Sequence, residues 1–149
     1  MSVVERDKKN ELHCAYKHLS AARINFLEVL EKLERLNIEN NIEFDKNKIY
    51  KLLYVLEKSI VVFIKIYLSE DIKNEDLSKL CNSLRAVRGI FEKEILDIII
   101  NNIDKIGDDI MENAIMLDLT DFIGNIANFE NHILRCLNYE SNISNGTKV

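Results

Sequence analysis

Two pairs of cysteine and histidine, each with a four-residue spacing, are the side chains of this sequence best suited to metal chemistry. Cys14 and His18 form the first pair, and His132 and Cys136 form the second. Residues four apart on a helix lie on one face. If the helices that carry the two pairs run antiparallel, the pairs converge into a Cys₂His₂ set, which binds structural zinc. The alternative interpretation is that the cysteines fill space in the core.

His18 also suggests a second kind of chemistry. It is followed by Leu-Ser-Ala-Ala-Arg, whose small residues leave room for a docking protein. This segment resembles the histidine phosphotransfer domains, which are helical bundles with a surface histidine, and the resemblance implies that His18 accepts a phosphoryl group. The Lys-Gly pair that usually follows such a histidine is missing here.

Basic side chains on two predicted helices are candidates for binding nucleic acid. If the two helices adjoin, their basic faces would follow a phosphate backbone, as in the small helical subunits of RNA-guided complexes that they resemble. The phenylalanines fall on apolar faces, so exposed aromatic rings for base stacking are not expected. The formal net charge of −5 also has the opposite sign to that of a typical nucleic-acid binder. The candidate residues are Lys51, Lys58, Lys65, Arg85, Arg88 and Lys93.

A third motif lies in residues 99–110, which read I-I-N-N-I-D-K-I-G-D-D-I. Four isoleucines at helical spacing, with Gly-Asp between the third and the fourth, resemble the BH3 motif, which implies anchoring of a helix in a groove. Too few residues follow for a Bcl-2-type fold, so we interpret the isoleucines as core residues. Arg85, Arg88 and Arg135 have no histidine at the spacing of the Arg-x₄₋₆-His motif of helical HEPN domains, and the Glu-x-x-His motif of di-iron bundles does not occur in the sequence. The four isoleucines are Ile99, Ile103, Ile106 and Ile110.

Amphipathic helices are expected to position these side chains. The clearest one spans about residues 11–37, where apolar residues alternate in steps of three and four, the heptad pattern of helix bundles. A second helix is expected at 46–68, with Asp45 as its N-cap. Its apolar residues lie almost all around it, which is typical of a central helix or of one that faces a partner. The heptad positions of the first helix are Leu12, Ala15, Leu19, Ala22, Phe26, Val29, Leu33 and Leu36.

Two further helices are predicted at about 75–106 and 108–138. Gly89 or Thr120 is expected to interrupt them, and Gly107 to end the third helix. Residues 1–10 are polar and expected to fray, and residues 140–149 to form a disordered tail. Together these elements predict a single all-α domain over residues 1–149, an antiparallel four-helix bundle.

Composition limits the class of protein. The chain has 149 residues, contains no proline, and has three widely spaced cysteines that do not form a disulfide framework. The absence of an apolar leader and of a long uncharged apolar run predicts a cytoplasmic protein without a membrane partner.

These observations favour a non-enzymatic interaction protein that acts as an adaptor, an inhibitor or a regulatory subunit, as a homodimer or with a stable partner. No cofactor is expected apart from the zinc considered above. The alternatives are a small subunit that contacts nucleic acid within a larger complex and a phosphotransfer-like bundle.

Overall fold

The protein is all-helical in its described residues. The computed structural model describes the backbone of residues 3–106 and 109–146, and the side chains of residues 3–106 and 111–138. The helices are α1 (Val3–Asn40), α2 (Lys46–Leu68), α3 (Asn74–Asn101), α4 (Ile103–Ile106) and α5 (Asp109–Gly146). The all-α prediction is thus confirmed, but these residues form five helices instead of four.

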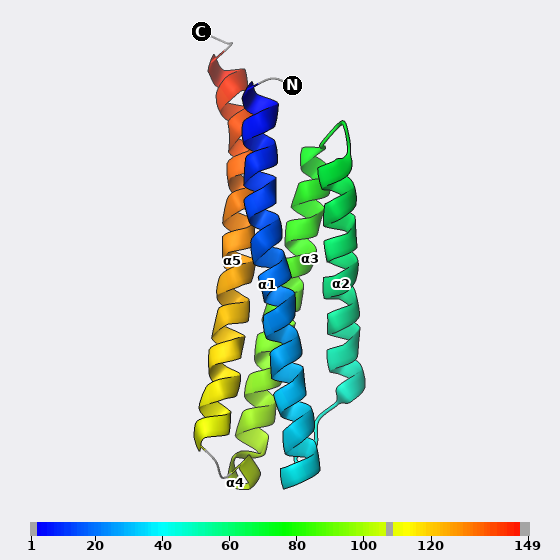
Figure 1. Cartoon of the computed structure of the whole chain (residues 1–149), viewed down its shortest axis with the longest axis vertical. Helices are drawn as coiled ribbons and strands as arrows, with labels where there is room; N and C mark the ends of the chain where they lie inside the picture. The colour runs from blue at the N-terminus through cyan, green and yellow to red at the C-terminus, as the bar shows by residue number, and fades with distance from the viewer. Residues whose placement is uncertain (1–2, 107–108, 147–149) are drawn as a thin grey trace.

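The four long helices lie side by side, and the chain reverses direction between each one and the next (Figure 1). The helix α1 packs along α5, while α2 packs along α3 (Figure 1). Contacts between α1 and α2 and between α3 and α5 join the two pairs. The helix α2 therefore lies beside α1 and α3, and the side that faces away from both is open to solvent.

Phenylalanine rings fill the centre of the molecule. Phe26 of α1 stacks on Phe91 of α3 with 3.9 Å between ring centroids, and Phe122 of α5 meets both rings edge-on. Phe63 of α2 meets Phe129 of α5 edge-on at 5.5 Å. All five rings are fully buried, and so is every heptad position of α1. The heptad pattern in the sequence therefore identified the buried face of α1 correctly.

The first helix begins at Val3, whereas residues 1–10 were expected to fray. Two lysines explain the difference. Lys8 is buried, and its Nζ donates a hydrogen bond to Asn74 Oδ1 over 3.2 Å. The Nζ of Lys9 donates to the carbonyl of Tyr67 at the end of α2, and it also lies over the Tyr67 ring. The polar residues that suggested fraying instead bind α1 to the neighbouring helices.

At the other end of the chain, α5 continues through residues 140–146, which were expected to be disordered. Extending an existing helix costs less than starting one, so a polar composition alone does not end it. The predicted tail residues 147–149 lie outside the described residues.

The third helix ends at Asn101, and the predicted helix 75–106 is divided at Asn102. The buried Asn102 amide donates to the carbonyl of Ile98 over 2.8 Å, and its backbone N–H also bonds the last turn. Gly89 and Thr120, the expected breaks, lie inside continuous helices, where the Thr120 hydroxyl donates to the Met116 carbonyl. The expected stop at Gly107 lies outside the described residues.

The division at Asn102 also separates the isoleucines of the BH3-like segment. Ile99 and Ile106 are buried, but Ile103 is 58% exposed, so it is not the core residue that was expected. The side chain of Ile110 is outside the described part of the chain. Because α3 ends within the motif, its isoleucines do not form one continuous helical face.

The N-terminus of α2 agrees with the sequence. Asp45 has extended backbone geometry, and its Oδ1 accepts a hydrogen bond from the backbone N–H of Lys48 over 3.1 Å. Before it, Asn41 adopts the left-handed conformation with φ of 55°, which asparagine tolerates better than most residues. These two residues fix the direction in which α2 leaves α1.

Candidate interaction surface on α2

The two histidines of the predicted zinc site come together between α1 and α5. The His18 and His132 rings stack with centroids 5.5 Å apart. The Nδ1 atom of His132 hydrogen-bonds Glu11 Oε2 over 2.6 Å, and that of His18 bonds Asn125 Oδ1 over 3.1 Å. Both rings are half-buried. The His18 ring is therefore packed against α5, unlike the open surface histidine that the phosphotransfer resemblance implies.

The two cysteines of the predicted site do not join the histidines. Cys14 is exposed on α1, while Cys136 is fully buried and its thiol lies 3.5 Å from the Lys8 carbonyl. Burial raises the pKa of Cys136 to about 12, which opposes the thiolate form that zinc needs. Within the side chains that the structure describes, no three His, Cys, Asp or Glu residues are placed to hold a metal. The predicted Cys₂His₂ set is therefore not assembled.

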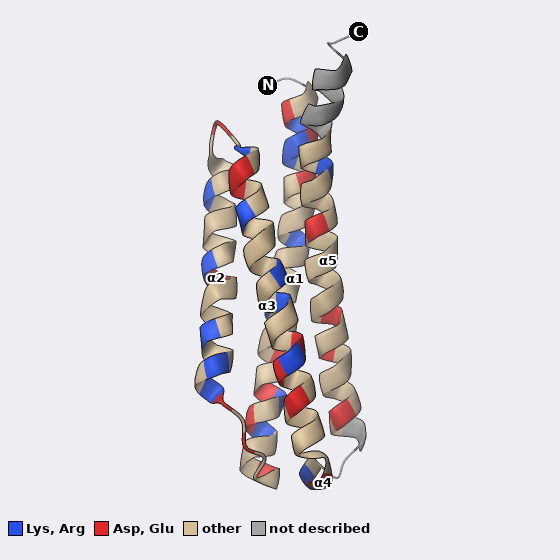
Figure 2. Cartoon of the chain, turned by 180° about the vertical axis from the view of Figure 1, so that it is seen from behind, with Lys and Arg blue, Asp and Glu red and all other residues tan. Residues whose placement is uncertain are grey.

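The basic residues proposed for nucleic acid come from the adjacent helices α2 and α3, and the two arginines among them pair with a carboxylate of α5. Arg85 and Arg88 of α3 face α5, where their guanidinium groups lie 3.4 and 3.7 Å from the two carboxylate oxygens of Glu130. Glu130 is buried, so the arginines compensate a carboxylate withdrawn from water. Lys93 is exposed on α3. Lys58 and Lys65 of α2 line the hollow between α2 and α3, and Figure 2 shows the lysines spaced along α2.

The solvent-facing side of α2 carries large apolar side chains. They are separated by steps of three, four and seven residues, which is a heptad pattern on the side opposite to the buried one. Glu57 occupies the heptad position between Tyr54 and Val61. We call these apolar residues the apolar stripe. With their exposed fractions, they are Tyr50 (46%), Tyr54 (65%), Val61 (51%), Ile64 (36%) and Leu68 (72%).

A row of positive charges runs beside the apolar stripe. Lys51, Lys58 and Lys65, which we call the lysine stripe, are spaced by seven residues and are all exposed. Among the described residues, none of the three forms an ion pair. The whole of α2 contains five lysines and one glutamate, a formal charge of +4, within a chain whose formal charge is −5.

Two carboxylates, one within the heptad seam of α2 and one on α1 beside it, are already engaged. Glu57 pairs with Arg23 of α1 at 3.0 Å, and the Tyr50 hydroxyl donates a 2.5 Å hydrogen bond to Glu34 of α1. That bond to Glu34 raises the pKa of Tyr50. The exposed face of α2 is therefore apolar at its heptad positions except Glu57, whose charge is paired with α1, and it is positively charged along the lysine stripe.

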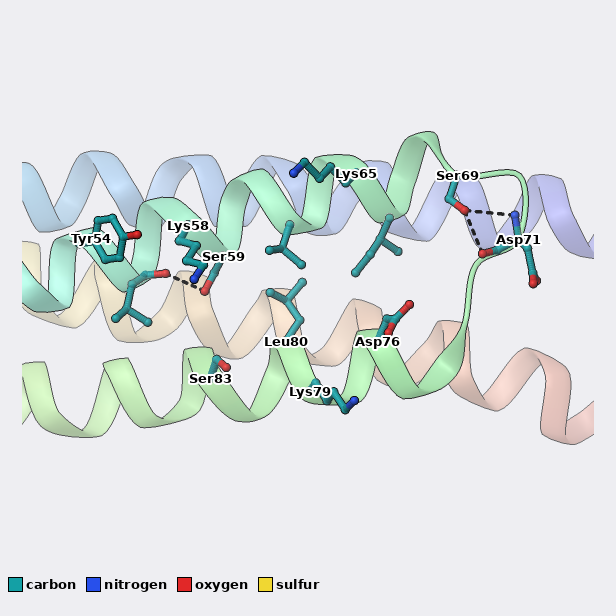
Figure 3. Close-up of a pocket in the computed structure, with 13 residues that line it drawn as sticks. Tyr54, Lys58, Ser59, Lys65, Ser69, Asp71, Asp76, Lys79, Leu80 and Ser83 are labelled. Atoms are coloured by element: carbon teal, nitrogen blue, oxygen red, sulfur yellow. Dashed lines mark hydrogen bonds between the residues drawn. The ribbon is translucent and has the colours of Figure 1, made fainter.

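Two hollows flank α2. One, of about 670 Å³, lies between α2 and α3 and has Val62, Ile66 and Leu80 among its lining residues. Figure 3 shows Leu80 and Asp76 projecting from α3 toward α2, and Lys58 and Lys65 of α2 also line this hollow. The other hollow, of about 390 Å³, lies between α1 and α2. Its lining is largely aromatic and apolar, and consists of His13, Tyr16, Phe63, Ile64 and Tyr67.

Sequence reasoning identified the lysine stripe and the surplus of apolar residues on the second helix, but it missed the exposed tyrosines. Tyr50 and Tyr54 continue the heptad spacing of Val61 and Leu68, so their exposure on the same face could have been predicted from that spacing. The helices in the described part of the chain include none that is long and apolar enough to cross a membrane.

Comparison of the chain with protein-family models, with curated proteins and with solved structures gives no match.

Proposed function

We propose that the chain is a non-enzymatic interaction protein, an antiparallel four-helix bundle built from α1, α2, α3 and α5 that presents α2 to another protein. In this role it acts as an adaptor, an inhibitor or a regulatory subunit. The observation that carries the proposal is the apolar stripe, because Tyr54, Val61 and Leu68 are each more than half exposed on one face of one helix. Exposed apolar residues that gather in one patch mark interaction sites more often than scattered ones do.

The buried face of α2 supports the same conclusion. Ile49, Leu56 and Phe63 already bury the side of α2 that faces the other helices. The apolar stripe is therefore not needed for the protein's own core. A cytoplasmic location belongs to the proposal, since the three cysteines are free thiols, as is usual in a reducing compartment.

A photo-crosslinking amino acid at Val61, introduced in the native host, tests this function. We expect a discrete covalent adduct with a protein. The matched control is Leu117 of α5, which is 66% exposed but lies on another helix and should give no such adduct. Equal adducts at the two positions, or none at Val61, would contradict the proposal.

Nucleic-acid binding is the second candidate function, and one observation favours it. Tyr50 and Tyr54 are exposed beside Lys51 and Lys58, and aromatic rings next to cations can stack bases while phosphates are neutralised. A protein partner accounts for more of the surface, because Val61, Ile64 and Leu68 continue the same stripe and offer no stacking plane to a base.

A further inference from the structure

We propose that α2 binds one acidic amphipathic helix of a partner protein. The apolar side chains of that helix would pack on the apolar stripe, and its flanking glutamates or aspartates would face the lysine stripe. This inference rests on the proposed function and adds the chemical class of the partner. Three observations support it: the spacing of the apolar stripe, the charge beside the stripe and the hollow at its edge.

The spacing of the apolar stripe fits a helix. Tyr50, Tyr54, Val61, Ile64 and Leu68 follow a heptad pattern, and a second helix packs its side chains into the holes of such a pattern. The stripe extends along nearly the whole of α2, which gives a partner helix of about five turns a long contact that only Glu57, paired with Arg23, interrupts. Docking of an amphipathic helix along an apolar face is a recurrent mode of recognition.

The charges beside the apolar stripe determine the sign of the charge that the partner helix should carry. Lys51, Lys58 and Lys65 occupy the position that flanks the heptad seam, where charged residues select partners in coiled coils. They form no ion pair within the described residues, whereas Glu57 of α2 pairs with Arg23 of α1, and Glu34 of α1 accepts a hydrogen bond from Tyr50 of α2. A helix with carboxylates facing the lysines would gain ion pairs without breaking any that the protein already has.

The same charges disfavour a second copy of this chain. In an antiparallel pair of α2 helices about a twofold axis, equivalent flanks face each other. Lys58 would then lie near its own counterpart, and Lys51 would face the partner copy's Lys65. Like charges placed opposite each other are unfavourable. Of the two occupants that the sequence suggested, the structure favours a different protein over a homodimer.

The hollow between α1 and α2 gives the partner helix an anchor point. Ile64 belongs both to the apolar stripe and to the lining of this hollow, beside Tyr16 and Phe63. A volume of about 390 Å³ is enough for one large apolar side chain. Interfaces concentrate their binding energy in such anchors, so we expect a leucine or an aromatic residue of the partner to enter here.

The test uses two designed helical peptides labelled with fluorescein. Both carry leucine at the two apolar heptad positions, and one has glutamate where the other has lysine at the flanking positions. Fluorescence anisotropy with the full-length chain should show binding of the acidic peptide that is at least about tenfold tighter, since several modest ion pairs act together. The triple variant K51E/K58E/K65E should reverse the preference.

The matched control is K17E/K93E/K105E, which has the same change in net charge on exposed lysines of α1, α3 and α4. It should retain the preference for the acidic peptide, and circular dichroism checks that both variants stay helical. Equal affinity for the two peptides, or a preference that changes alike in both variants, overturns the proposal.

Other outcomes separate this inference from the proposed function. Peptides that fail to bind, together with a protein adduct at Val61, overturn the acidic helix and leave the interaction function standing. Failure of both experiments removes both. An oligonucleotide that binds the wild type tightly and loses affinity in K51E/K58E/K65E, while the two peptides bind equally, assigns the surface to nucleic acid instead. A wild-type dimer that dissociates on substitution V61D assigns the surface to a second copy.

Discussion

The three cysteines occupy environments that give their thiols different reactivities. Cys14 is exposed on α1, whereas Cys81 and Cys136 are buried between helices. Burial raises the pKa of Cys81 to about 11 and that of Cys136 to about 12. A thiol must lose its proton to attack an electrophile. The two buried cysteines are therefore protected from reaction both by their lack of solvent exposure and by their raised pKa values.

We expect one thiol of the native protein, Cys14, to react with a disulfide reagent at pH 8, and all three to react after unfolding in guanidinium. Substitution of Cys14 by Ser should abolish the fast phase, while Cys81→Ser should leave it unchanged. The measurement is the number of thiols released before and after denaturation. Fast reaction of two or three thiols in the folded protein would contradict the burial of Cys81 and Cys136.

The helix α2 shows how local sequence signals and surface properties combine in one element. Its start is set by Asp45, whose side chain satisfies a backbone N–H of the first turn. Its buried face is set by Ile49, Leu56 and Phe63. Nothing in that packing requires the apolar stripe or the lysine stripe, which makes the outer face free to serve binding.

Removing the N-cap should weaken the protein without altering the outer face of α2. Asp45→Ala is expected to lower the free energy of unfolding by about 1 kcal/mol, because the Lys48 N–H then loses its acceptor. Urea denaturation followed by circular dichroism measures the loss. Asp97→Ala, at an exposed position inside α3, is the control and should change stability by less. Equal losses in the two variants would show that the cap does not stabilise α2.

At the scale of the whole molecule, the aromatic cluster joins helices that are distant in the sequence. Phe26, Phe91 and Phe122 come from α1, α3 and α5 and contact one another, while Phe63 and Phe129 link α2 to α5. Every long helix therefore contributes at least one ring to the same core. We expect the chain to unfold as one cooperative unit, since no long helix has a separate core.

Phe26→Ala tests that expectation. Deleting a fully buried ring should lower the free energy of unfolding by about 3–5 kcal/mol through lost burial and the cavity that remains. Ile24→Ala on the same helix, where the side chain is 54% exposed, should cost far less. Tyrosine fluorescence and far-ultraviolet circular dichroism should report the same urea midpoint for each variant. Separate midpoints for the two probes would mean that the helices do not share one core.

The sequence by itself determined the position of the four long helical segments, although not all of their ends, and the buried face of α1. The bounds 46–68, the Asp45 cap and the heptad face of α1 all follow from local spacing, because helical periodicity and capping depend on residues within one or two turns. The end of α3 at Asn101 was not predicted from the sequence, although the spacing of the isoleucines changes phase just before it.

Only the tertiary structure decided which side chains from different helices meet. His18 stacks on His132, Cys14 is exposed while Cys136 is buried, and Arg85 and Arg88 approach Glu130 of α5. These pairings depend on the rotation and axial shift of one helix against another. A heptad pattern shows which face of a helix is buried, but it does not determine that rotation or that shift. The exposure of the apolar stripe was decided in the same way, because α2 has neighbours on only two sides.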